Sequence, residues 1–270
     1  MKRSYPSAFI SLCAALAASS LVTAHCASTG AKDDSGGKEA VQEIRVGRAL
    51  AARLINKYGI VRNQEQVRYI GLVGRSLARV SSRPELDFHF GILDTDEVNA
   101  FACPGGYILV TKGALRLMDN EAELAGVLAH EIAHVALRHS GEFRVQETTW
   151  LEFVAGILGG GNVMSTAFHK VTGDLEKKIL ENGRQKDLEF EADKAGLLYA
   201  AAVGYQPVAA ITYLERTARA KGNDVLVKTH PNSGDRIGGI RRFINEEGLR
   251  QTGVLNRERF QKYFSPAKLK

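Results

Sequence analysis

Two histidines four residues apart, with a glutamate directly after the first, constrain this chain more than any other feature: the motif runs from His130 to His134. Residues four apart project from the same face of an α-helix, so both imidazole rings can reach one metal ion while Glu131 lies beside it. A helix is predicted here from Asn120 to about His139, because Asn120 and Glu123 have the spacing of a capping box. We therefore expect this helix to carry a metal site.

A second predicted helix, over residues 185–202, carries two carboxylates four residues apart, Glu189 and Asp193. A catalytic zinc site takes three protein ligands and keeps a fourth position for water. One carboxylate can supply the third ligand, and the other can accept a hydrogen bond from the free ring nitrogen of a ligating histidine. An acidic helix is by itself typical of a solvated face. Next to the histidine pair it favours a site for Zn²⁺, with one ion per chain.

The remaining pattern predicts an α+β fold, mostly helical around a small β-sheet with an exposed edge strand. Apolar side chains spaced four apart indicate helices, and strict alternation of apolar and polar side chains indicates strands. Further helices are predicted over residues 41–58, from Asn63 onward, from Pro207 to near Gly222 and from Ser233 to about Glu247, and strands over residues 86–92 and 107–111.

The amino terminus is typical of an exported protein. Residues 1–25 are predicted to be a signal peptide, with a short basic start and a long apolar stretch. Two processing sites compete: ordinary cleavage after Ala24, or lipidation of Cys26 at a bacterial lipobox. Residues 26–40 are predicted to be a flexible tether and residues 41–270 the folded domain. We expect a periplasmic protein, tethered to the outer membrane if Cys26 is lipidated.

Composition excludes several other classes of protein. The formal net charge is +6 and 24% of the residues are charged, with both signs mixed along the chain. Because no basic run is interleaved with aromatic residues, no nucleic-acid partner is expected. Apart from the leader, no segment is long and apolar enough to span a bilayer, so a lipid at Cys26 is the only expected membrane contact. Cys103 is interpreted as a packed core residue.

Four motifs in a fixed order resemble the CaaX-protease/HtpX family of gluzincin zinc endopeptidases. They are the motif at residues 130–134, EFEAD at 189–193, NAFACPGG at 99–106, and Thr229-His230-Pro231 followed by Arg236. The resemblance covers about residues 41–243 and implies a zincin-type metalloprotease domain. It is strongest to small single-domain periplasmic lipoproteins associated with quality control of outer-membrane proteins.

The resemblance also implies the roles of the site residues. His130, His134 and Glu189 are the zinc ligands, Glu131 is the general base and acid, and Asp193 supports a ligand from behind. This chemistry needs those residue types: zinc lowers the pKa of the attacking water to about 7. Glu131 then takes its proton and passes it to the leaving amine.

His230 and Arg236 are the candidates for a donor that stabilises the oxyanion. Pro231 is expected to hold His230 in an extended conformation, off any helix. In some relatives the matching histidine instead caps the zinc and keeps the enzyme inactive. The plainer alternatives are a loop histidine hydrogen-bonded to the backbone and, for Arg236, an ordinary salt bridge. His139 and His89 are interpreted as structural residues outside the site.

Two segments are given a place around the site. The strand containing Asn99, Ala100, Phe101 and Ala102 is predicted to pair with an extended substrate at the sheet edge. Residues 140–187, with three glycines at positions 159–161, are either a lid or plug over the cleft or a core helical hairpin.

Taken together, the site and the resemblance predict a zinc-dependent endopeptidase of the bacterial cell envelope that cleaves unfolded or misassembled envelope proteins. The alternative is a zinc-stabilised periplasmic chaperone or assembly factor with a latent protease site.

Overall fold

The protein is described by a computed structural model over residues 35–139, 170, 172–177, 185–220, 224–230, 233–249 and 252–269. Several predicted features lie outside these residues: the signal peptide, Cys26 with its two processing alternatives, most of the tether, most of segment 140–187, and Pro231. Among the described residues no helix is both long and apolar enough to cross a membrane.

The first helix, α1 (Ser35–Tyr58), forms because apolar side chains recur four residues apart. Val46, Leu50 and Leu54 are fully buried. Gly59 ends the helix at φ +77°, a left-handed conformation that glycine adopts without strain. The helix begins earlier than the predicted boundary at residue 41, so the last part of the predicted tether is helical rather than flexible.

The second helix, α2 (Gln64–Ala78), begins where the sequence predicts. The side chain of Asn63 accepts hydrogen bonds from the backbone N–H groups of Glu65 and Gln66, at 3.1 and 3.2 Å. The Gln66 side chain does not complete a capping box. It donates instead to the carbonyl oxygen of Tyr263, at 2.9 Å, and so ties α2 to the carboxyl-terminal region.

Three short strands form a mixed sheet: β1 (His89–Leu93), β2 (Ala100–Cys103) and β3 (Tyr107–Thr111). The order is β1-β3-β2, with β1 parallel and β2 antiparallel to β3. A short 3-10 turn, η1 (Pro104–Gly106), joins β2 to β3. A Cβ atom at Gly105 would lie 2.5 Å from the Ile44 backbone of α1, so the close approach of α1 to this turn requires glycine.

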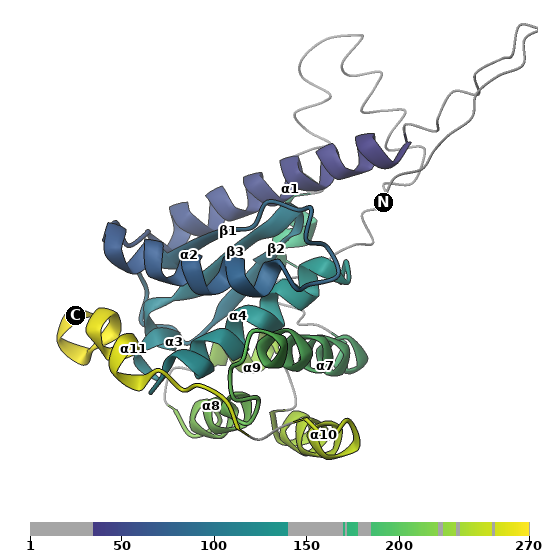
Figure 1. Ribbon diagram of the computed structural model, residues 1–270. Helices are drawn as coiled ribbons and strands as arrows, with labels where there is room; N and C mark the ends of the chain where they lie inside the picture. Colours follow the sequence, from purple (N-terminus) through teal and green to yellow (C-terminus); the bar gives the residue numbers. More distant parts are fainter. Residues whose placement is uncertain are drawn as a thin grey trace, which may run out of the picture. The chain divides into compact units, whose positions relative to one another are not determined.

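Helices cover both faces of the sheet (Figure 1). Phe101, Cys103 and Leu109 point to one face and pack against α1. Ile108 and Val110 point to the other face, in the same core as residues of α2 and of the helix α4 (Glu121–Ala136). The α+β class with a small sheet is therefore confirmed.

Strand β2 lies at the edge of the sheet, as predicted, and is bonded only to β3 among the described strands, but its residues are buried. Ala100, Phe101 and Ala102 are 4%, 1% and 0% exposed. Its side chains are buried on both faces of the sheet, since Phe101 packs toward α1 and its two neighbours pack toward α4.

Helix α4 begins at the predicted N-cap, where the Asn120 side chain accepts from the backbone N–H of Glu123 at 3.1 Å. It packs against α7 (Lys186–Ala202), and Gly196 lies where the two backbones are close. A Cβ atom at Gly196 would lie 2.9 Å from the backbone nitrogen of His130. These two helices therefore touch through backbone at the position where the metal motif sits.

The carboxyl-terminal part combines predicted and unpredicted helices. The two predicted ones are found as α8 (Ala209–Thr217), which ends before Gly222, and α10 (Ser233–Glu246). Short helices escaped prediction because they contain too few turns to show a periodic pattern. These are α3 (Lys112–Arg116), α9 (Asp224–Thr229), α11 (Arg257–Phe264) and the 3-10 turn η3 (Pro266–Lys268).

A buried carboxylate joins these regions. Glu121, 0% exposed at the start of α4, accepts hydrogen bonds from the Tyr69 hydroxyl of α2, from Tyr205 Oη at 2.7 Å and from Arg259 Nε of α11 at 2.6 Å. Burial raises the pKa of Glu121, but these donors outweigh it and hold the pKa below its ordinary value.

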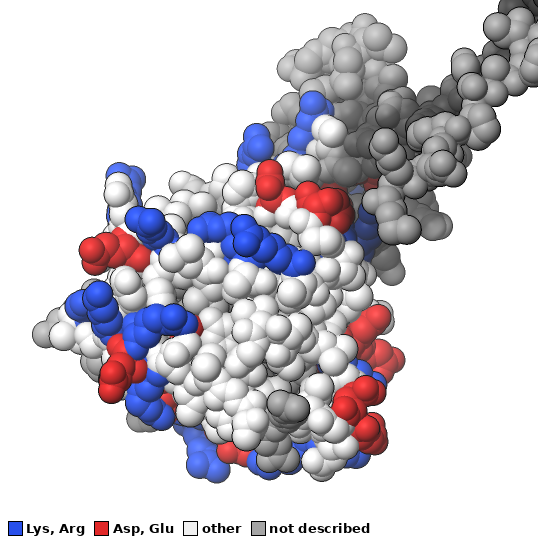
Figure 2. All heavy atoms as spheres, in the orientation of Figure 1, with Lys and Arg blue, Asp and Glu red and all other residues white. Residues whose placement is uncertain are grey.

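On the face seen in Figure 2, charged side chains of both signs lie mainly toward the rim around a broad uncharged area.

Candidate metal centre

Four metal-binding side chains converge between α4 and α7. His130 and His134 come from α4, Glu189 from the first turn of α7, and His230 directly follows α9. All four are buried, and one donor atom of each lies within 4.8 Å of the other three. The three ligands predicted from the sequence thus meet at one point, because the four-residue spacing on α4 aims both rings at α7.

The distances within this cluster suit one small cation. The Nε2 atoms of His130 and His134 are 3.0 Å apart. Glu189 lies opposite them, with Oε1 at 3.3 Å from His134 Nε2 and Oε2 at 3.4 Å from His130 Nε2. Two imidazoles and a carboxylate are the donor set of many catalytic zinc sites. The residues present therefore fit a zinc ion.

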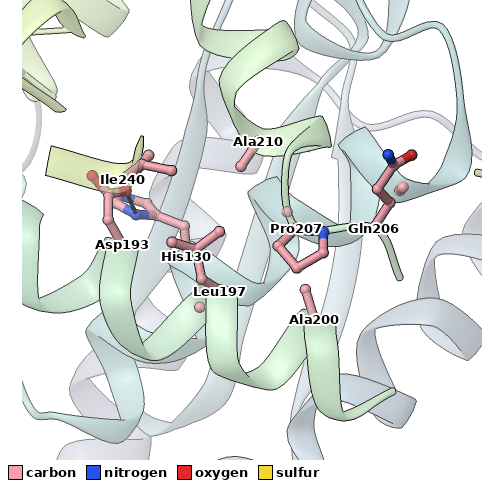
Figure 3. A pocket seen from close by; sticks show the side chains of 11 residues that line it. His130, Asp193, Leu197, Ala200, Gln206, Pro207, Ala210 and Ile240 are labelled. Carbon is pink, nitrogen blue, oxygen red and sulfur yellow. Dashed lines mark ion pairs between the residues drawn. The ribbon is translucent and has the colours of Figure 1, made fainter. Parts of the chain in front are cut away.

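Asp193 lies behind His130, one turn further along α7 than Glu189. Its Oδ1 atom is 2.9 Å from His130 Nδ1, so this ring nitrogen can carry the hydrogen while Nε2 offers its lone pair to a metal. Figure 3 shows this pair at the wall of a pocket lined by side chains of α7, α8 and α10. The position of Asp193 is the one that the sequence predicts.

Arg236 on α10 forms an ion pair with the same carboxylate through two hydrogen bonds. Its Nε donates to Asp193 Oδ2 at 2.8 Å and its Nη2 to Oδ1 at 2.6 Å, and its Nη1 lies 3.1 Å from Glu189 Oε2. Arg236 as a whole is 5% exposed. The salt bridge considered for Arg236 is thus formed, and it links α10 to both carboxylates of α7.

These ion pairs set the charge states of the site. Burial raises the pKa of Asp193, but the Arg236 cation outweighs it and lowers the pKa to about 2. Burial also raises the pKa of Glu189, and His230 with the two α4 histidines holds it far below its ordinary value. Burial and Arg236 lower the pKa of His130, whereas its hydrogen bonds to Asp193 and Glu189 raise it to about 9. Both carboxylates are therefore ionised at neutral pH.

Glu131 lies beside the metal ligands, one step around α4 from His130. It is 2% exposed, and its Oε2 atom accepts no hydrogen bond within the part of the chain that the structure describes. Its Oε1 atom is 3.6 Å from His230 Nε2. A buried carboxylate oxygen of this kind is available to a water molecule at the site.

His230 lies within hydrogen-bonding distance of the predicted ligands. Its Nδ1 atom is 2.9 Å from Glu189 Oε2 and 3.4 Å from His130 Nε2. It directly follows the short helix α9, which was not predicted. The backbone N–H of His230 donates to the carbonyl of Leu226 at 2.7 Å, so the end of α9 holds the ring over the cluster.

Asn99 is the member of the predicted substrate strand that reaches the site. It lines a cavity together with Glu131, His230 and the apolar side chains of Tyr213 and Leu226. Its Oδ1 accepts from the backbone N–H of Ala100 and from the Thr229 hydroxyl, at 2.9 and 3.2 Å. Its Nδ2 is buried and has no acceptor among the residues described.

His139 was left out of the site by the sequence interpretation, yet it touches a ligand. Its Nδ1 atom is 2.8 Å from Nδ1 of His134. The chain reaches this position because Arg138 adopts a left-handed backbone conformation, with φ 56°. Non-glycine residues rarely adopt this conformation, so no sequence pattern predicts the contact between His139 and His134.

Comparison with known proteins places this geometry in a family. The model of peptidase family M48 matches residues 64–244, which include all four residues of the cluster. This chain belongs to peptidase family M48. The resemblance inferred from the motifs and the expected class of enzyme, a metallopeptidase, are thereby confirmed. The family match also covers Asn99, Asp193 and Arg236.

Relatives in this family come from bacteria and from mitochondria. The chain is 29% identical over 217 residues to the beta-barrel assembly-enhancing protease of Escherichia coli, covering 76% of this chain and 44% of that protein. It is 30% identical over 191 residues to the mitochondrial metalloendopeptidase OMA1 of Schizosaccharomyces pombe, covering 68% of this chain and 54% of that protein. The chain thus spans about half the length of these relatives.

Proposed function

We propose that this M48 peptidase is a zinc-dependent endopeptidase of the bacterial cell envelope that cleaves unfolded or misassembled envelope proteins. One observation carries the proposal: donor atoms of His130, His134, Glu189 and His230 lie within 4.8 Å of one another, with Glu131 beside them. The name of the Escherichia coli relative supports an envelope substrate. An exported, lipid-tethered location rests on the leader and Cys26 alone.

In the proposed site His130, His134 and Glu189 hold the zinc ion. When bound, zinc supplies a Lewis acid that polarises the peptide carbonyl and lowers the pKa of water. Glu131 takes the proton of the attacking water and gives it to the leaving amine. The burial of Glu131 supports this role, and so does its Oε2 atom, which accepts no hydrogen bond from the described residues and is available to the attacking water.

Two further side chains orient the substrate. Asn99 Nδ2 is a buried donor without an acceptor in the described part of the chain, which supports a hydrogen bond to a substrate carbonyl. His230 is better placed than Arg236 to donate to the oxyanion, because two hydrogen bonds already hold Arg236 on Asp193.

The alternative function, a chaperone or assembly factor with a latent protease site, is favoured by the same His230. Its Nδ1 is 2.9 Å from Glu189 Oε2, so this ring nitrogen can itself reach a metal ion held by the cluster. If this ring coordinated zinc, it would fill the fourth coordination position, which a catalytic site keeps for water, and the enzyme would be inactive.

The test is cleavage of an unfolded protein such as casein by the purified chain, with its zinc content measured. For Glu131→Gln we expect one zinc per chain and cleavage lowered by at least about 100-fold, as for loss of a general base. Glu246→Gln, an exposed change on α10, is the matched control.

Each outcome decides between the two functions. Cleavage that persists in Glu131→Gln would refute the proposed base. Zinc binding without cleavage, followed by cleavage in His230→Ala, would identify His230 as the residue that silences the site. Zinc binding without cleavage in either protein would favour the chaperone.

A further inference from the structure

We propose that His139 is the positioning residue for the second histidine ligand: it accepts the Nδ1 hydrogen of His134 and is itself held by Glu191. This inference rests on the proposed ligand set, in which His134 binds zinc through Nε2.

The backbone conformation at the end of α4 places His139 beside His134. Arg138 is left-handed, and the N–H groups of Arg138 and His139 donate to the carbonyls of Val135 and His134, at 3.0 and 2.9 Å. This is the hydrogen-bond pattern of a Schellman motif, which turns the chain back over the last turn of a helix. It brings His139 beside the ring of His134, with the two ring planes at 69°.

The side chains then form a continuous path to a carboxylate. His139 Nδ1 is 2.8 Å from His134 Nδ1, and His139 Nε2 is 3.3 Å from Glu191 Oε2. The side chain of His139 is only 3% exposed, whereas that of Glu191 is 58% exposed. A nearly buried imidazole is thus anchored at one ring nitrogen by a ligand and at the other by an acidic residue.

With neutral rings, one arrangement of hydrogens satisfies both the contact of His139 with Glu191 and its contact with His134. A carboxylate accepts, so His139 Nε2 carries the hydrogen that points to Glu191. His139 Nδ1 then offers a lone pair, and His134 Nδ1 must donate to it. His134 Nε2 is left with its lone pair directed at His130 and Glu189, which is where a metal ligand needs it.

The two histidine ligands are therefore supported in different ways from one helix. Asp193 of α7 accepts directly from His130, at 2.9 Å. Glu191, on the same helix, reaches His134 only through His139. Because Glu191 is exposed and Asp193 is buried, the support of His134 is the weaker of the two and depends on His139 being in place.

The experiment measures zinc affinity by competition with a chromophoric chelator, for the full chain and three variants. His139→Phe keeps a ring but removes the acceptor, and we expect zinc affinity about 10- to 100-fold lower. His139→Asn places an acceptor near the lost Nδ1, and we expect it to regain at least about half of that loss on a logarithmic scale. Glu191→Gln weakens the far anchor, and we expect a loss of about threefold.

His89→Phe is the matched control, because His89 is an exposed histidine on β1 whose ring stacks on Tyr107 of β3. The thermal unfolding of each metal-free variant shows whether it folds. If His139→Phe does not fold, Glu191→Gln decides, since its side chain lies at the surface.

Three results would overturn the inference: His139→Phe with unchanged zinc affinity, His139→Asn as weak as His139→Phe, or, where Phe prevents folding, Glu191→Gln with unchanged affinity. Failure of the proposed ligand set looks different. In that case the unaltered protein binds no zinc, or His134→Ala still binds it, and both proposals fall.

Discussion

The ionisation of Asp193 decides how the site responds to acid. Arg236 and His130 hold its carboxylate in the charged form, and its pKa is lowered from 3.8 to about 2. A group whose pKa is lower in the folded state stabilises that state above its ordinary pKa. This contribution is present above about pH 4 and is lost as the pH falls to about 2, and at about 1.4 kcal/mol per unit it is worth roughly 2 kcal/mol.

We therefore predict that the free energy of unfolding of Asp193→Asn falls less between pH 4 and pH 2 than that of the unaltered protein. Urea unfolding, with a chelator present, is measured between pH 6 and pH 2 for both proteins. The free-energy difference between them should shrink by about 2 kcal/mol between pH 4 and pH 2. Parallel curves over that interval would show that the carboxylate contributes nothing through its charge.

At the scale of elements, the contact between α4 and α7 sets the geometry of the ligands. His130 and Glu189 sit on different helices, and Gly196 permits their backbones to touch: an added Cβ would meet the His130 backbone nitrogen at 2.9 Å and the Ala129 carbonyl carbon at 3.1 Å. Backbone atoms cannot move aside as a flexible side chain can, so any side chain at 196 separates the helices.

Gly196→Ala is predicted to lower the free energy of unfolding by about 1–3 kcal/mol and to weaken zinc binding as well. Denaturant unfolding and chelator competition measure the two effects. Gly234→Ala is the control, because among the described residues nothing beyond its own chain neighbours and helix turn lies within 4 Å of an added Cβ there, and it should lower neither quantity. Equal behaviour of the two variants would mean that the helix contact tolerates expansion.

At the scale of the whole molecule, the cluster joins parts that are distant in the sequence. Its members come from α4, α7 and the end of α9, and Arg236 adds α10. A metal that binds only the folded state stabilises it by mass action, by about 4 kcal/mol when its free concentration is 1,000 times the dissociation constant.

Chelation of the metal should therefore lower the thermal midpoint of the unaltered protein by several degrees, about 2–4 °C for each kcal/mol lost. His134→Ala should unfold at the same temperature with and without chelator. Calorimetry of both proteins makes the comparison. A chelator effect of equal size in His134→Ala would place the stabilising metal elsewhere.

The sequence alone determined the parts of this protein that depend on local spacing. Residues four apart share a helix face whatever the surroundings, so the ligands of α4 and the carboxylates of α7 were predictable. The N-caps at Asn63 and Asn120 were predictable for the same reason, because each bond spans only a few residues.

Tertiary structure alone decided the rest, since those features depend on contacts between distant segments. The burial of β2 follows from α1 and α4 packing on its two faces. The contact of His139 with His134 needs Arg138 in a left-handed conformation that no local preference favours. His230 reaches the ligands only because α9 ends beside α7, a hundred residues along the chain from His130. The four-residue spacing within α4 and α7 thus identified the ligands, and the packing of distant segments determined which residues surround them.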